Sequence, residues 1–234
     1  MPVIRRLLGR LRHEESGFTL VELLVSCIIG TIILLATFMM LDSSVVLTGK
    51  VTDRVDRTQR SRVAMEDITR KLRSQVCPAA GQASIISADD YSVRFYSFLG
   101  TRPFVSDIRE ISWDTNTNSI IEKRWLGSTT TPNTAWAATP TSRTVISDVK
   151  PTFVSGNSGP RGPVFRYFLS GSASPITTPL SATNAAATTR ISLAFMTYAQ
   201  SKNLTGPATT IQNEIFVRTS DPNATSGSTA PDCA

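Results

Sequence analysis

The sequence predicts an α+β protein, in which a long N-terminal helix packs on an antiparallel β-sheet domain. The first observation is an apolar run over 18–41, followed by no proline until Pro78. The second is a change after Gly81 to short β-type runs separated by loops rich in Gly, Ser, Thr and Pro. The third is length: of the 234 residues, roughly 150 follow the long helix, enough for one globular domain with its own core.

The apolar run over 18–41 contains one charged residue, Glu22. About 20 apolar residues suffice for a helix to cross the hydrocarbon core of a bilayer. A charge inside such a run is costly and usually marks a function. Basic residues precede the run, which predicts a cytoplasmic amino end and an extracytoplasmic remainder: they are Arg5, Arg6, Arg10 and Arg12.

Residues 17–25, Gly-Phe-Thr-Leu-Val-Glu-Leu-Leu-Val, resemble the processing site of type IV prepilins and type II secretion pseudopilins. The resemblance implies that a membrane aspartic prepilin peptidase cleaves after Gly17 and methylates the new amine of Phe18. It also implies that Glu22 is the glutamate used in assembly. Two other interpretations fit less well. A secretory signal has a shorter apolar core and a small-x-small cleavage site, and a plain membrane anchor has no use for Glu22.

Cleavage before Phe18 would place a cation at the head of the apolar helix. A second copy of the helix, displaced along its axis, could offer this amine to Glu22 of its neighbour. The apolar helix would then assemble subunits as well as anchor one.

The helix is predicted to continue over 42–76. Apolar residues recur there at steps of three and four, namely Val51, Val55, Met65, Ile68, Leu72 and Val76. Eight basic and four acidic residues lie between Lys50 and Arg73, which predicts a solvated face or salt bridges between subunits. Nucleic acid remains an alternative because basic stripes attract phosphate, although the stripe lacks the aromatic residues on which single strands stack.

Seven strands are predicted in the remaining domain, at 92–98, 107–113, 120–125, 143–149, 164–169, 190–199 and 211–219. The intervening Asp114–Asn118 is interpreted as a hairpin turn. It is not a calcium loop, because Ser119 stands where glycine is needed and Trp125 where glutamate is needed. The strand patterns loosely resemble those of the minor pseudopilin J and minor pilin W groups.

The cysteines fit an extracytoplasmic domain. Cys27 lies in the apolar run, whereas Cys77 and Cys233 lie beyond it. An oxidising compartment allows the latter two to pair, and a disulfide would hold the Ser/Thr/Pro-rich tail. Two unpaired thiols are the alternative.

Nothing in the sequence indicates an enzyme, a cofactor or a metal site. The single histidine, His13, lies in the predicted leader, so the mature chain lacks the common general base and zinc ligand. The adjacent Asp89 and Asp90 are interpreted as a solvated turn.

These observations predict a minor pilin or pseudopilin with four segments: a cleaved cytoplasmic leader (1–17), a transmembrane and assembly helix (18–41), its amphipathic continuation (42–76) and an extracytoplasmic β-rich domain (77–234). The expected partners are prepilin peptidase, other pilins, the inner-membrane assembly platform and the membrane. The expected location is the cytoplasmic membrane and then a filament at the cell envelope. Two alternatives stay open: a DNA-uptake or adhesive pilus subunit, and an anchored domain that never polymerises.

Overall fold

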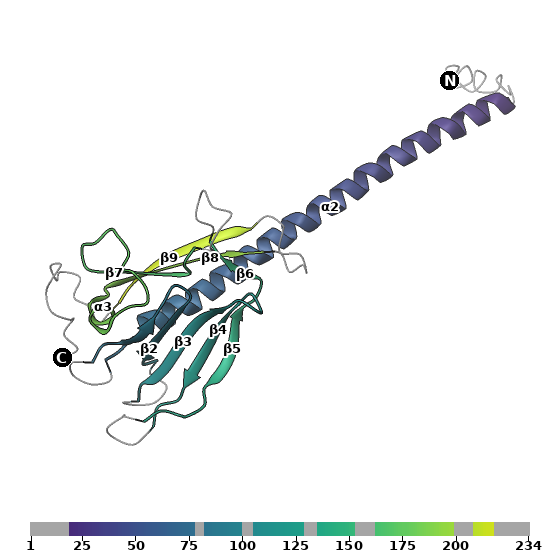
Figure 1. Cartoon of the computed structure of the whole chain (residues 1–234). Coiled ribbons are helices and arrows are strands. Elements are labelled where there is room, and N and C mark those ends of the chain that lie inside the picture. Colours follow the sequence, from purple (N-terminus) through teal and green to yellow (C-terminus); the bar gives the residue numbers. More distant parts are fainter. Residues whose placement is uncertain are drawn as a thin grey trace, which may run out of the picture. The chain divides into compact units, whose positions relative to one another are not determined.

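The computed structural model describes residues 19–77, 82–99, 105–128, 135–152, 162–198 and 208–217. The chain divides into two compact units, Met1–Thr52 and Asp53–Ala234. The described residues form two helices and nine strands (Figure 1). This composition confirms the predicted α+β class.

The long helix α2 spans Leu20–Arg73 without interruption. It passes through Gly49, which weakens a helix by about 1 kcal/mol relative to alanine but does not break this one. Arg70, Lys71 and Arg73 occupy its last turn, where cations interact favourably with the negative end of the helix dipole. The helix ends at Arg73, earlier than the predicted end at residue 76.

Helix residues of the first unit are exposed throughout. Their most apolar stretch has a mean hydropathy of 2.5, with none of it buried. By length and composition, this part of α2 can cross a membrane.

The second unit contains a five-stranded antiparallel sheet in which the strands follow one another in chain order. These strands are β1 (Ile85–Ala88), β2 (Ser92–Ser97), β3 (Asp107–Asp114), β4 (Ser119–Trp125) and β5 (Thr141–Ile146). The predicted hairpin is confirmed, since β3 pairs with β4 from Ile108↔Trp125 to Asp114↔Ser119. In its turn the Asp114 carboxylate accepts hydrogen bonds from the Asn116 N–H at 2.9 Å and the Thr117 hydroxyl at 2.8 Å.

A second antiparallel sheet is built around β8 (Arg190–Thr197). This strand pairs with β6 (Val149–Pro151), β7 (Phe165–Phe168) and β9 (Thr209–Phe216). The short helix α3 (Ala182–Ala187) begins after Ser181, whose side chain accepts a hydrogen bond from the Asn184 N–H at 3.2 Å.

The structure corrects two predictions about strands and one about a loop. The strand predicted at 143–149 is divided between β5 and β6, which belong to different sheets, and Asp148 between them has φ of 59°. Strand β1 was not predicted. Helix α3 lies in a segment, 170–188, that was interpreted as a loop, although alanine is the best helix former and serine a strong N-cap.

The core of the second unit lies where α2 meets both sheets. On the helix, Ala64, Met65, Ile68 and Leu72 are buried, and burying each of the three larger side chains contributes about 1.5–3 kcal/mol. They join a cluster that includes, from the sheets, Val93, Phe95, Ile111, Phe165, Leu193 and Phe195. The amphipathic prediction is therefore right at Met65, Ile68 and Leu72. It is wrong at Val51 and Val55, which are 56% and 50% exposed.

Candidate functional site

The start of helix α2 forms the first candidate site. The Thr19 carbonyl accepts hydrogen bonds from the N–H groups of Glu22 and Leu23, at 3.0 and 3.1 Å. The Thr19 hydroxyl accepts from the Glu22 N–H at 3.3 Å. Thr19 and Glu22 occupy the first and last positions of a capping-box sequence, Thr-x-x-Glu. Glu22 is exposed in the first turn, where the positive end of the helix dipole favours its negative charge.

From Leu23 to Leu41 the surface of α2 carries no charged side chain and is apolar on all sides. From Leu20 to Leu47 every large apolar residue is exposed, between 48% at Val25 and 80% at Leu20. A helix that is apolar all round is normally buried in protein or in a membrane. Apolar surface of this extent indicates that lipid or other helices cover it.

The hydroxyl groups along this stretch are satisfied within the helix. Ser26 donates to the Glu22 carbonyl at 2.7 Å, Thr31 to the Cys27 carbonyl at 2.8 Å, and Thr37 to the Leu34 carbonyl at 2.8 Å. A hydroxyl that bonds back to its own helix needs no water. These polar residues are therefore compatible with an apolar environment.

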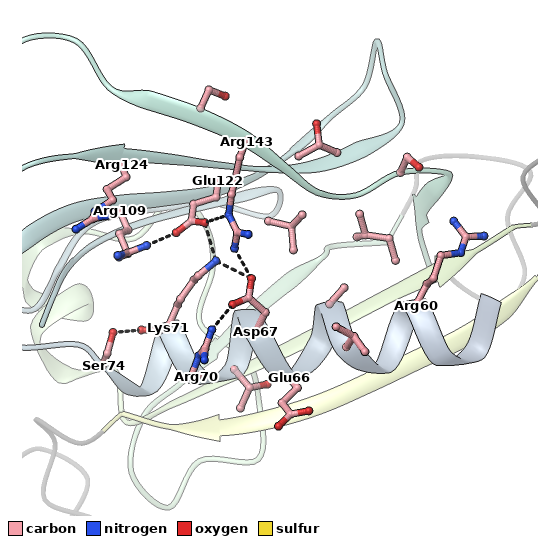
Figure 2. A pocket seen from close by; sticks show the side chains of 18 of the residues that line it. Arg60, Glu66, Asp67, Arg70, Lys71, Ser74, Arg109, Glu122, Arg124 and Arg143 are labelled. Carbon is pink, nitrogen blue, oxygen red and sulfur yellow. Dashed lines mark hydrogen bonds and ion pairs between the residues drawn. The ribbon is translucent and has the colours of Figure 1, made fainter. Parts of the chain in front are cut away.

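A second candidate site is a cluster of charged side chains between α2 and the first sheet (Figure 2). The Glu122 carboxylate on β4 is 4% exposed and contacts three cations. Lys71 Nζ lies 2.6 Å from Oε2, Arg143 Nε lies 2.7 Å from the same oxygen, and Arg109 pairs with Oε1. Lys71 also bonds Asp67, at 2.7 Å.

Both carboxylates of this cluster are stabilised in their charged form. Burial by itself would raise the pKa of Glu122, but hydrogen bonds from Lys71 and Arg143 hold the pKa below its usual value. Burial also acts to raise the pKa of Asp67, and hydrogen bonds from Lys71 and Arg70 again lower it. The Glu122 carboxylate raises the pKa of Arg143. The pKa shifts of Glu122, Asp67 and Arg143 therefore all favour the charged form of these groups.

The cluster lines an open groove of about 1560 Å³. The groove lies between the second half of α2 and strands β4 and β5, and its described lining holds seven basic and four acidic residues. Among the described residues, no group of three or more His, Cys, Asp or Glu could hold a metal ion. The groove can therefore bind an anionic partner through Arg and Lys side chains.

Comparison with known families explains the first site. The family model of the prokaryotic N-terminal methylation motif matches residues 12–38. The chain carries this methylation motif at its N-terminal end. The match confirms the predicted resemblance to the type IV pilin and pseudopilin family, and proteins with this motif are generally structural. Comparison with curated proteins gives no match.

The predicted site residues fall in different places along the chain. Glu22 lies in the first turn of α2. Gly17 and Phe18 fall within the matched motif but lie outside the described residues, as does Cys233. Cys77 is half-buried and follows the end of α2. Cleavage, methylation and the pairing of Cys77 with Cys233 stay predictions.

The capping role of Thr19 and the charged cluster around Glu122 were both missed in the sequence analysis. The signal for Thr19 was present, because Thr-x-x-Glu before an apolar run is a helix start. The predicted solvated basic face is wrong for Arg57 and Lys71, which are 6% and 3% exposed. Glu122 shares the inward face of β4 with the fully buried Ile120. A glutamate at an inward-facing strand position is the one local sign in the sequence that a buried cation contacts it from a neighbouring element.

Proposed function

We propose that this protein is a minor pilin or pseudopilin, a structural subunit of a type IV pilus or of a type II secretion filament. One observation carries the proposal: the methylation motif stands at the head of a helix whose apolar surface is exposed over the whole first unit. Such a helix suits both a membrane before assembly and a bundle of like helices afterwards. In the filament, Glu22 would supply the charged group that pairs with a neighbouring subunit.

In the proposed pathway, prepilin peptidase removes 1–17 by cleavage after Gly17 and methylates Phe18. The basic leader remains on the cytoplasmic side and the second unit on the other side of the membrane. Subunits then leave the membrane for a filament, in which helices of neighbouring pilins cover the surface over 18–41.

Glu22 would dock each subunit through the amine of a neighbour's Phe18. A carboxylate left unpaired in lipid costs several kcal/mol. The positive end of the helix dipole offsets part of this cost within the subunit. The remaining cost favours pairing with the amine.

The test separates charge from capping. Glu22→Gln keeps an N3 side chain suited to a capping box but removes the charge. Asp42→Asn is the matched control, since Asp42 is also exposed on α2. We expect both variants to be inserted and processed in the native cells, and only Glu22→Gln to be missing from sheared filaments on immunoblots. Normal filament entry of Glu22→Gln would contradict the pairing.

A further inference from the structure

Strand β5 leaves one side of the first sheet open. It is the last strand of that sheet and pairs with β4 alone, as Figure 1 shows. Its residues 141–144 are exposed. In the described part of the chain, no backbone hydrogen bond reaches the outer edge of β5. An edge of this kind is a template for one more strand.

The groove next to this edge has an excess of positive charge. Two of its carboxylates already have several basic partners: the partly buried Asp67 contacts Arg70, Lys71 and Arg143, and the buried Glu122 contacts three cations. The side chains of Arg70 and Arg143 are still 70% and 56% exposed. Arg73 is exposed too, and it forms no ion pair with any other described residue.

These two features lie on the same groove. Arg143 belongs to β5 itself, whereas Arg70 and Arg73 lie on the facing helix. A strand added to β5 would direct alternate side chains into the groove, and carboxylates on those side chains would meet the exposed guanidinium groups. The backbone edge and the cations therefore recognise different parts of one ligand.

We propose that this groove binds an extended acidic segment of a second, different protein chain, which adds to β5 as a further strand. A second copy of this protein fits less well because the chain carries a formal net charge of +6. In the proposed filament the partner is a neighbouring subunit of another type. That identification rests on the proposed function, whereas the binding of an acidic strand does not.

Nucleic acid is attracted by the same cations but would leave the edge of β5 unused. Phe98 is the one aromatic residue among the described residues that line the groove, so bases would find few stacking partners. The observations therefore favour a peptide.

The test uses the full chain in detergent micelles and fluorescence anisotropy. The probe is a labelled peptide of alternating glutamate and threonine. We compare it with a version in which glutamine replaces glutamate, a version methylated at every backbone nitrogen, and a DNA duplex. We expect the glutamate peptide to bind and both modified peptides to bind at least about tenfold more weakly. The glutamine peptide loses the charges that strengthen its contacts with the guanidinium groups, and the methylated peptide loses its backbone N–H donors.

A pair of variants locates the site. Arg73→Gln should weaken binding of the glutamate peptide roughly two- to fivefold, the effect of one exposed ion pair. Arg62→Gln should leave it unchanged, because Arg62 is exposed on the same helix but does not line the groove.

Three results would overturn the proposal: no binding of the glutamate peptide, equal binding of either modified peptide, or DNA binding that exceeds peptide binding and is lost in Arg73→Gln. Glu22→Gln should bind the peptide normally. Loss of filament entry and loss of peptide binding therefore report on separate hypotheses.

Discussion

Replacing Glu122 by glutamine tests whether the buried cluster stabilises the second unit. The substitution keeps size and shape but removes the charge shared by Lys71, Arg109 and Arg143. Lys71 and Arg109 have side chains only 4% and 6% exposed, so water cannot replace the carboxylate. Removing one partner of a buried ion pair typically costs about 3–5 kcal/mol.

This cost converts to a shift in melting temperature. A unit of this size loses about 2–4 °C per kcal/mol, so Glu122→Gln should lower the Tm by roughly 6–20 °C. Near-UV circular dichroism of the full chain in detergent is the assay. All tryptophans, Trp113, Trp125 and Trp136, lie in the second unit, so the signal does not depend on the apolar helix.

The matched control is Glu110→Gln on the neighbouring strand β3. Glu110 pairs with Arg94 at 2.7 Å and Lys123 at 3.4 Å, and these partners are 38% and 43% exposed. Each exposed pair contributes about 0–1 kcal/mol, so the loss of both pairs should lower this Tm by at most about 8 °C. If the two variants melted alike, the buried cluster would contribute no more than a surface pair, and the reasoning would be refuted.

Two further predictions concern acid stability and the cysteines. The pKa values of Asp67 and Glu122 are lowered in the folded protein. Their contribution to the free energy of unfolding is therefore complete above the unfolded pKa values of about 4 and is lost as pH falls through the folded values. The Tm should fall below about pH 4, and an equally steep fall in Glu122→Gln would exclude Glu122 as a cause. Peptide mapping without reductant should recover Cys77 linked to Cys233, and alkylation of both thiols before reduction would contradict this pairing.

Much of the first unit follows from the sequence alone because its determinants are local. A run of apolar residues without proline is sufficient to predict a helix over 18–41, whatever surrounds it. The methylation motif is a contiguous string, and the family match over 12–38 confirms its assignment. The hairpin at Asp114–Asn118 was also predictable, because turn residues stand between two β-type runs.

Tertiary structure decided the features that depend on residues far apart in the chain. Lys71 and Glu122 are separated by 51 positions, and the pattern on α2 could not show that Lys71 turns inward. The division of 143–149 between two sheets depends on the backbone at Asp148 and on the strands available for pairing, β4 for β5 and β8 for β6. The role of a charged side chain or a strand edge depends on the residues that pack against it. Helical or strand periodicity shows which face a residue lies on but not which residues it will contact.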